Sequence, residues 1–184
     1  EKKSAEVVKM VTSLSDFFRT TLSKGHDYIT VKEERTHIES YLEIQQFRYQ
    51  DILDYEIQMD EEIYGYIIPK LTLQPLVENA LYHGIKNKRG KGKILITGKK
   101  QGDKIIFQVI DNGKGMTGEE LNSLRKKMAG TDTGDEAKGF GVSNVNPRIK
   151  YYYGGEYGVF FESKENEGTN ATIIIAAKNI QLLS

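Results

Sequence analysis

The chain has 184 residues, 26 basic side chains (lysine and arginine) against 26 acidic ones, and no cysteine. Its length suits one ordinary domain with a helical extension, its balanced charge excludes a general attraction to nucleic acid or to an anionic membrane, and the missing cysteines exclude disulfides and thiolate metal sites. Apolar runs stay far below the ~20 residues of a membrane-spanning helix, and because the sequence shows neither an initiator methionine nor a signal peptide at Glu1, we expect a fragment of a longer protein.

The N-terminal stretch has the periodicity of an amphipathic helix that ends at Lys24-Gly25. Apolar residues recur at spacings of three and four, at Val7, Val11, Leu14, Phe18 and Leu22. This stripe fits a helix packed on its own domain, and it fits equally well a short heptad seam that pairs with a second copy of the chain. The two interpretations stay open at the level of sequence.

A second helix is predicted from Lys32 to Gln50, because its acidic first turn suits the positive end of the helix dipole. Its apolar face is formed by Ile38, Tyr41, Leu42 and Tyr49. The following segment "YEIQMD" alternates like a strand, and Pro69 then breaks the chain. We therefore place a domain boundary near Gln50, with a helical segment at 1–50 and a second domain at 51–184.

The segment "LTLQPLVENALYHG" predicts a third helix that stops at Gly84, with a buried stripe of Leu73, Leu76, Val77, Ala80 and Leu81. Two strands, "KILITGKK" and "KIIFQVI", follow as a hairpin, and two more, "YGVFFES" and "NATIIIAA", close the domain. Helices are predicted between these pairs, from Thr117 to Met128 and after "GFG". This order predicts an α+β fold: a two-layer α/β sandwich whose mixed, mostly antiparallel sheet carries helices on one face and is preceded by the N-terminal helices.

The motif "DNGKGM", Asp111 to Met116, fits none of the simpler sites that share its composition. Asn-Gly favours a hairpin turn, but the residues that follow predict a helix and not a strand. A calcium loop would need oxygen ligands where Gly113 and Gly115 stand. "GKGMTG" matches the dinucleotide pattern G-x-G-x-x-G, but the preceding strand belongs to a hairpin and not to a parallel βαβ unit. The sequence contains no Walker A motif either.

A purine and phosphate site remains as the interpretation of two glycine pairs. Asp111, at the end of a strand, can accept a hydrogen bond from an exocyclic amine, and Gly113 and Gly115 would let the backbone approach a flat ring. Gly139 and Gly141 open a helix, whose main-chain N–H groups suit a polyphosphate. Either pair alone would be weak support for such a site.

The helix before these motifs presents polar side chains at a helical spacing. Asn79, His83 and Lys86 stand at i, i+4 and i+7, so an α-helix would place them on one face. An amide, an imidazole and an ammonium on that face suit Mg²⁺ and phosphate contacts. Glu78 lies roughly 100° round the helix from Asn79 and can accept a proton from a nucleophile. Each of these side chains, taken alone, is better explained as part of a solvated helix face.

Four stretches in this order, "LVENALYHG", "DNGKGM", "GFGVSN" and "EGT", resemble the N box and the three glycine boxes of the GHKL ATPase superfamily. That superfamily contains gyrase-type topoisomerases, large heat-shock chaperones, histidine kinases and mismatch-repair ATPases. "LSDFFR", "YLEIQQFR" and "IPKLTLQPLVENA" resemble bacterial sensor histidine kinases of the subclass with an "NPHFLYN"-like phosphoacceptor helix. The likeness extends from about Leu14 to Ala176, and several boxes in one order are far more specific than any one of them.

The resemblance implies that the glycine boxes bind ATP. Asp111 corresponds to the acid that reads adenine, and Gly113 and Gly115 correspond to the glycines that flank the base. Thr169 corresponds to the threonine that supports this acid through hydrogen bonds or water. Residues 117–138 correspond to the mobile lid over ATP.

The resemblance also implies roles for the N box. Asn79 corresponds to the amide that binds Mg²⁺, and Glu78 to the residue that acts as base or orients the nucleophile. The residues implied in phosphate binding are His83, Lys86, Gly139 and Gly141.

The phosphoacceptor helix of this subclass is missing from the sequence. His26, in "HDYIT", matches the H-[DE]-x-x-[NT] pattern of the commoner kinase subclass, but it follows Gly25 at a predicted helix end. His37 lies within a predicted helix but lacks the following acid. We therefore expect the phosphoacceptor histidine upstream of Glu1.

The implied function is that of the catalytic region of a sensor histidine kinase, which transfers the ATP γ-phosphate to a histidine. The implied partners are a response regulator and a second copy of the chain, without nucleic acid. A membrane would be reached only through the missing N-terminal part of a bacterial inner-membrane sensor, with this region in the cytoplasm. Two alternatives stay open: a GHKL ATPase that hydrolyses ATP to drive conformational change, and an interaction module that senses nucleotide without catalysis.

Overall fold

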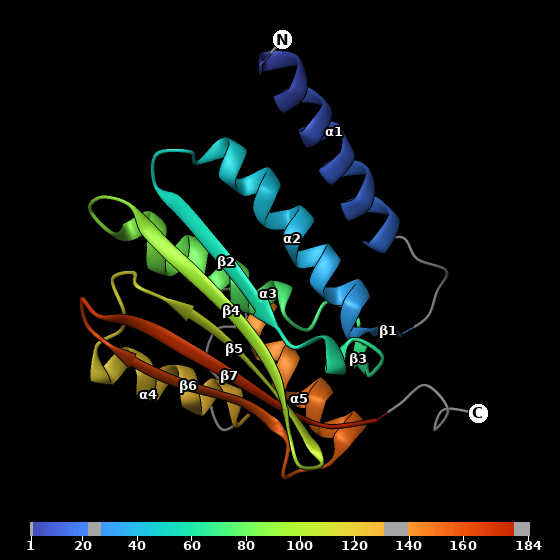
Figure 1. Cartoon of the computed structure of the whole chain (residues 1–184). Helices are drawn as coiled ribbons and strands as arrows, with labels where there is room; N and C mark the ends of the chain where they lie inside the picture. The colour runs from blue at the N-terminus through green and yellow to red at the C-terminus, as the bar shows by residue number, and fades with distance from the viewer. Residues whose placement is uncertain (1, 22–26, 131–139, 179–184) are drawn as a thin grey trace.

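A five-stranded sheet forms the centre of the fold, and helices cover one of its faces (Figure 1). The computed structural model describes residues 2–21, 27–130 and 140–178. The strands in spatial order are β2 (Leu53–Met59), β4 (Gly92–Gln101), β5 (Lys104–Asp111), β7 (Gly168–Ala176) and β6 (Gly158–Lys164). Neighbouring strands pair antiparallel except β2 and β4, which pair in parallel. The predicted mixed, mostly antiparallel sheet is therefore confirmed.

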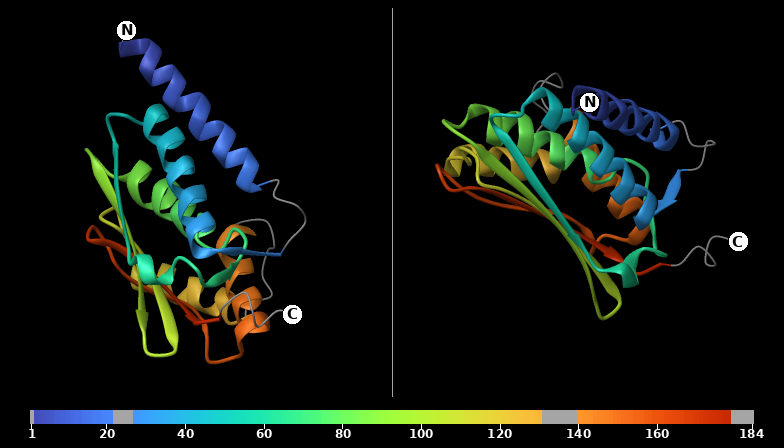
Figure 2. Two further views of the ribbon diagram at one scale, coloured as in Figure 1. Left: turned by 45° about the vertical axis from the view of Figure 1, so that its right-hand side comes forward. Right: turned by 45° about the horizontal axis from the view of Figure 1, so that its top comes forward.

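The helices form the second layer. They are α1 (Lys2–Thr21), α2 (Val31–Arg48), α3 (Gln74–Asn79), α4 (Gly118–Met128) and α5 (Phe140–Tyr153). Figure 2 shows α2, α3, α4 and α5 on the same side of the sheet, as a two-layer sandwich requires. None of the helices in the described residues is both long and apolar enough to cross a membrane.

Strand β5 illustrates why the sheet is half-buried. Ile105, Phe107 and Val109 alternate along it and are buried in the core, whereas the residues between them are partly exposed. Phe107 is the register partner of Ile173 on β7, which is also fully buried. Because successive side chains of a strand point to opposite faces, this alternation fixes which face the helices cover.

A small second sheet, which the sequence did not predict, lies beside the start of α2. β1 (Tyr28–Thr30) pairs antiparallel with β3 (Ile67–Pro69). Thr30, the last residue of β1, caps α2: its hydroxyl accepts the N–H of Glu33, and the Glu33 carboxylate accepts the N–H of Thr30. This reciprocal capping box satisfies main-chain donors that the helix itself leaves free, and it fixes the start of α2.

Helix α1 does not bury its predicted apolar stripe. Val7, Val11 and Phe18 are each more than half exposed, and Leu14 is exposed as well. The helix contacts α2 with a different face, because buried Ser13 donates a hydrogen bond to Glu43 on α2. The interpretation that the stripe packs on its own domain is therefore wrong for these four residues, while Leu22 lies outside the described residues.

The third helix has the predicted place but not the predicted regularity. α3 continues as a π-helix over Ala80–Gly84 and as a 3-10 helix over Ile85–Asn87, so it does not stop at Gly84. The predicted buried stripe is confirmed, since all five of its members are buried. A π-helix winds more widely than an α-helix because its hydrogen bonds span five residues. The α-helical spacing assumed for Asn79, His83 and Lys86 is therefore wrong.

A buried carboxylate joins α2 to the start of α3. Glu34 is fully buried, and it accepts hydrogen bonds from the main-chain N–H groups of Leu71 (3.2 Å) and Leu73 (2.7 Å). Burial raises the pKa of Glu34 to about 7, although these N–H groups and the positive charge of Arg148 act to lower it. The contact fixes the start of α3 against α2, so the residues that follow on α3 have a defined place relative to α2.

Candidate functional site

Asp111, the last residue of β5, is the centre of the candidate site. It is only 4% exposed, and its Oδ1 atom accepts the main-chain N–H of Gly113 at 2.8 Å. A β-carbon added at Gly84 would lie 2.6 Å from that oxygen, and one added at Gly113 would lie 2.4 Å from the carbonyl carbon of Gly84. Real β-carbons do not approach so closely. The carboxylate, the end of the π-helix and the glycine loop are therefore packed with no room for a side chain at either glycine.

The environment of Asp111 raises the pKa of its carboxyl group toward neutral pH. Burial raises the pKa of Asp111 to about 6, against the lowering effects of the N–H groups of Gly113 and Thr169 and the charge of Lys88. Above that pH the carboxylate is ionised and is a strong acceptor for an amine donor. Below it the group is neutral, and the charge-assisted part of such a hydrogen bond is lost.

We predict that adenine nucleotide affinity depends on pH through Asp111. As the pH falls from 7.5 to 5, the carboxylate takes up a proton, and we expect affinity to fall about tenfold. Asp111→Asn should bind about tenfold more weakly at pH 7.5, with no such fall, because an amide does not titrate. Calorimetric titration of both proteins at each pH checks this. The nucleotide phosphate also titrates near this pH, but it affects both proteins equally, so it cancels in the ratio of the wild-type affinity to the Asp111→Asn affinity. A ratio that stays constant with pH would contradict the assignment.

The glycine loop after Asp111 is held by main-chain contacts. Gly115 has a φ of +64°, which favours glycine, and a β-carbon there would lie 2.0 Å from the carbonyl oxygen of Lys164. Lys114 donates its N–H to the carbonyl of Gly84 and accepts the N–H of Asn166 at 2.6 Å. The loop is thus fixed between the end of the helix and the turn that joins β6 to β7.

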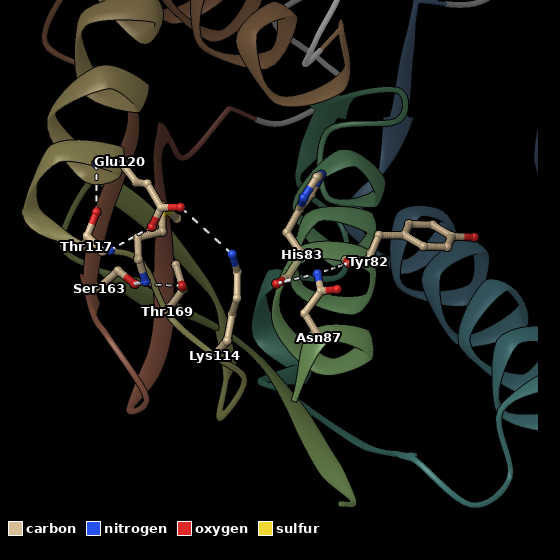
Figure 3. A network of polar contacts seen from close by, with 9 residues as sticks. Tyr82, His83, Asn87, Lys114, Thr117, Glu120, Ser163 and Thr169 are labelled. Carbon is tan, nitrogen blue, oxygen red and sulfur yellow. Dashed lines mark hydrogen bonds and ion pairs between the residues drawn. The ribbon is translucent and has the colours of Figure 1, made fainter. Parts of the chain in front are cut away.

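Ser163 and Thr169 connect the same loop to the sheet (Figure 3). Thr169 is the register partner of Asp111, and its hydroxyl lies 2.9 Å from that of Ser163. Ser163 Oγ also accepts the N–H of Met116 at 2.9 Å and lies 2.8 Å from the carbonyl oxygen of Gly168. Sequence reasoning missed Ser163 and Gly84, because both act through spatial neighbours that are distant along the chain.

The N box residues lie on the helix that ends against Asp111. Glu78 and Asn79 are half-buried in the last turn of α3, and His83 is exposed on the π-helix. Figure 3 shows His83 and Tyr82 leaving that helix in different directions. Lys86 places its ammonium 4.8 Å from the ring centre of Tyr82 and 5.0 Å from that of Tyr49. The structure therefore places Lys86 on the side of the helix that faces Tyr49, at the end of α2.

The second glycine pair and the predicted lid are described in part. Gly139 lies outside the described residues, whereas Gly141 is exposed in the first turn of α5, where a β-carbon would lie 3.3 Å from Cβ of Pro75 on α3. Within the predicted lid, 117–138, the structure describes α4 and the residues up to 130. Thr117 caps α4 through a capping box with Glu120, and Arg125 donates to the carbonyl of Phe161 on β6 at 2.7 Å.

The structure thus brings the predicted residues together in two groups. Asp111, Gly113, Gly115 and Thr169 form one group at the ends of β5 and β7. The helix with Glu78, Asn79 and His83 forms the other, and Gly84 joins it to Asp111 by direct contact. A buried carboxylate acceptor beside a side-chain-free backbone suits a flat ring with an exocyclic amine.

Comparison with known proteins agrees with this geometry. The family of histidine kinase-, DNA gyrase B- and HSP90-like ATPases matches residues 69–179, and a histidine kinase family matches residues 1–53. The sensor histidine kinase YesM of Bacillus subtilis is 34% identical over 95% of the chain, and the sensor protein LytS of Staphylococcus saprophyticus is 29% identical over 97% of it. The chain spans only 28% and 30% of the length of these two relatives.

Solved structures show the same fold. The catalytic domain of histidine kinase ThkA superposes with a TM-score of 0.60 at 18% identity, over 83% of this chain and 97% of its own. The mycobacterial sensor histidine kinase MprB superposes with a TM-score of 0.56 at 16% identity, over 84% of this chain and 99% of its own. The ordered boxes, the buried acid with its glycines and the family match lead to one conclusion: the chain belongs to the histidine kinase-, DNA gyrase B- and HSP90-like ATPase family.

Proposed function

We propose that this chain binds Mg-ATP and is the catalytic region of a longer sensor histidine kinase. The observation that carries the proposal is the contact of Asp111 with Gly84 and Gly113, where a buried acceptor meets backbone that has no space for a side chain. The adenine amine would donate to Asp111, and the ring would lie over the glycines. Thr169 would hold the carboxylate through its main-chain N–H.

The phosphates would lie toward the helix and the second glycine pair. We assign their contacts to His83, Lys86, Gly139 and Gly141. Lys86 would have to leave the two tyrosine rings on which it rests, at a cost of about 0.5–1 kcal/mol for each exposed cation–π contact. His83 is exposed and needs no such change.

Asn79 is the residue that we propose to hold Mg²⁺. The described residues contain no group of three or more histidine, aspartate or glutamate side chains that could hold a metal ion by themselves. That finding suits Mg²⁺, which keeps several waters and takes one or two protein oxygens together with substrate phosphates. When bound, the ion would neutralise charge on the transferred phosphoryl group.

The proposed reaction is in-line transfer of the γ-phosphoryl group to an imidazole nitrogen of a histidine upstream of Glu1. A phosphorus–nitrogen bond forms as the bond between the γ-phosphorus and the bridging oxygen breaks, and ADP leaves. Glu78 would accept the imidazole proton or orient the ring. The phosphoryl group would then pass to an aspartate of a response regulator.

A second copy of the chain is the proposed partner of α1. The exposed stripe of Val7, Val11, Leu14 and Phe18 has the spacing of a helix-pairing seam. Burying it against the same stripe of another copy would remove apolar surface from water, worth about 25 cal/mol per Å².

We predict that Val11→Asp weakens dimerisation at least tenfold, because it places an unpaired charge in the seam. Sedimentation equilibrium over a range of concentrations measures the effect. Thr12→Asp is the matched control, because Thr12 is exposed on a different face of α1. Equal dimerisation of wild type and Val11→Asp would contradict the proposed seam.

Binding and phosphotransfer together separate this function from its rivals. A thermal shift with ATP that depends on Mg²⁺ supports the nucleotide site, and its absence favours an interaction module without nucleotide. Labelled γ-phosphate that appears on a histidine of the parent kinase supports phosphotransfer. Steady release of inorganic phosphate without labelled protein would instead favour an ATPase that drives conformational change. The chain alone should not label itself, and label on His26 would contradict the assignment of an upstream acceptor.

A further inference from the structure

A hydrogen-bonded chain of side chains runs from α2 to Glu78. The Nε2 atom of His37, on α2, lies 2.6 Å from Oε1 of Gln74, the first residue of α3. The Nε2 atom of the same Gln74 amide donates to Oε1 of Glu78 at 2.8 Å, one helical turn later. His37 is fully buried, whereas Gln74 and Glu78 are half-buried. The proposed mechanism uses Glu78 but assigns no role to His37 or Gln74.

The chemistry of the amide fixes the direction of this chain. The Gln74 NH₂ group must face Glu78, because an amide oxygen there would meet a carboxylate oxygen and neither could donate. The amide oxygen must then face His37, so His37 Nε2 carries the proton. The other ring nitrogen of His37, Nδ1, is buried without a hydrogen-bond partner. A proton there would leave a buried donor unsatisfied, so the ring is neutral. Burial lowers the pKa of His37 and acts in the same direction.

Helix α1 covers the far end of the chain. The ring of Phe17 stacks on the His37 ring, with centroids 4.7 Å apart and planes 18° from parallel. Phe17 also packs against Tyr41, at 6.1 Å between ring centres. The contacts form one continuous path from α1, through His37 and Gln74, to the carboxylate beside Asn79.

We propose that Gln74, held by His37, is a positioning residue that fixes the carboxylate of Glu78. This inference rests on the proposed function and adds how its base is oriented. Gln74 occupies Oε1 of Glu78, and Oε2 has no hydrogen-bond partner among the described residues. That oxygen is left to take the proton of an incoming imidazole. A carboxylate with a defined rotamer loses less freedom in the transition state than one that turns freely.

The path also gives α1 a means to influence the reaction. Moving Phe17 away would open His37 to water, which would compete for Nε2–H and so release the Gln74 amide. The helix that carries the proposed dimer seam is therefore connected to Glu78, the base of the proposed kinase, through the side chains of His37 and Gln74.

The first test needs no catalytic activity. The sequence contains three histidines, so ¹⁵N labelling of histidine gives few imidazole signals, and His37→Phe assigns one of them. We expect His37 to be neutral, with a slowly exchanging proton on Nε2 in the wild-type chain. Gln74→Leu should make that proton exchange at least tenfold faster while the thermal unfolding curve stays cooperative. A proton on Nδ1, or unchanged exchange in Gln74→Leu, overturns the chain of contacts.

The second test measures phosphotransfer in the parent kinase. Gln74→Leu should lower the rate at saturating Mg-ATP by about 10- to 100-fold, with nucleotide affinity within about twofold of wild type. In a Glu78→Gln background the same change should lower the rate by no more than about twofold. If Gln74→Leu caused only a structural defect, it would lower the phosphotransfer rate by the same factor in the wild-type and the Glu78→Gln backgrounds. That result would overturn the inference. Gln45→Leu, a half-buried glutamine on α2 whose Oε1 is unpaired, is the matched control.

Two further readouts keep the outcomes separate. If Gln74→Leu does not fold, His37→Phe decides: it keeps a ring against Phe17, removes the donor, and should lower the same rate about threefold or more. An unchanged rate overturns the inference. Failure of the wild-type parent kinase to bind Mg-ATP or to transfer phosphate contradicts the proposed function, whereas the imidazole measurement still decides whether His37 and Gln74 are joined.

Discussion

Asn79→Ala is expected to abolish Mg²⁺-dependent phosphotransfer in the parent kinase. Asn79 closes α3 one residue after Glu78, at the point where the helix changes to its wider π form. We propose that its amide oxygen is the protein ligand of Mg²⁺. Removing a residue that only supports a metal ligand lowers metal affinity or activity by about 10- to 100-fold. Removing the direct ligand should therefore lower the phosphotransfer rate by more than about 100-fold.

The same variant should keep most of its affinity for nucleotide without metal, because Asp111 and its glycines are unchanged. Calorimetric titrations with and without Mg²⁺ measure this difference beside the phosphotransfer assay. Gln58→Ala is a suitable control, since it also removes an amide but from an exposed position on β2, where Gln58 contacts Glu56. Phosphotransfer by Asn79→Ala at the wild-type rate would exclude this residue as the metal ligand.

Gly113→Ala is expected to abolish adenine binding. Its β-carbon would lie 2.4 and 2.5 Å from two main-chain atoms of Gly84 and 2.6 Å from Oδ1 of Asp111. The two nearest neighbours are main-chain atoms, so the loop or the helix end must move, and the Asp111 carboxylate must move with them. Such overpacking costs about 1–3 kcal/mol of stability. The displaced carboxylate should weaken ATP binding by at least about 100-fold, beyond the loss expected for Asp111→Asn.

Gly65→Ala is the matched control for this experiment. A β-carbon at Gly65 would have no atom within 4 Å, and Gly65 does not have a positive φ. Calorimetric titration with ATP and thermal unfolding of both variants separate a local effect from general destabilisation. If Gly113→Ala bound ATP as tightly as Gly65→Ala, the contact between Gly113 and Gly84 would not be part of the proposed adenine site.

The regular elements could be predicted because their signals are local. The alternation of Ile105, Phe107 and Val109 marks β5, and the apolar spacing of Leu73, Leu76 and Val77 marks the buried side of α3. The ordered boxes led to the family before any geometry was known. Asp111 and Thr169 could be connected through the resemblance, and the pairing of β5 with β7 places them opposite each other.

The remaining features depend on contacts between distant segments. Nothing local in β2 shows that it pairs in parallel with β4, and the three-residue strands β1 and β3 are too short for a periodic signal. The π-helix follows residues that fit an α-helix equally well, so the place of Lys86 over Tyr49 could not be derived. The role of Gly84 was missed because it resembled an ordinary helix stop.

The parallel edge pair has a practical consequence for shortened versions of the chain. β2 lies at one edge of the sheet, and among the described strands only β4 pairs with it. Removing β2 would leave the N–H and C=O groups of β4 as a free edge, which is a template for aggregation. A chain that begins at residue 51 keeps β2 but lacks α2, whose Ile38 and Leu42 are fully buried in the core. A soluble minimal version should therefore begin no later than Thr30, the cap of α2.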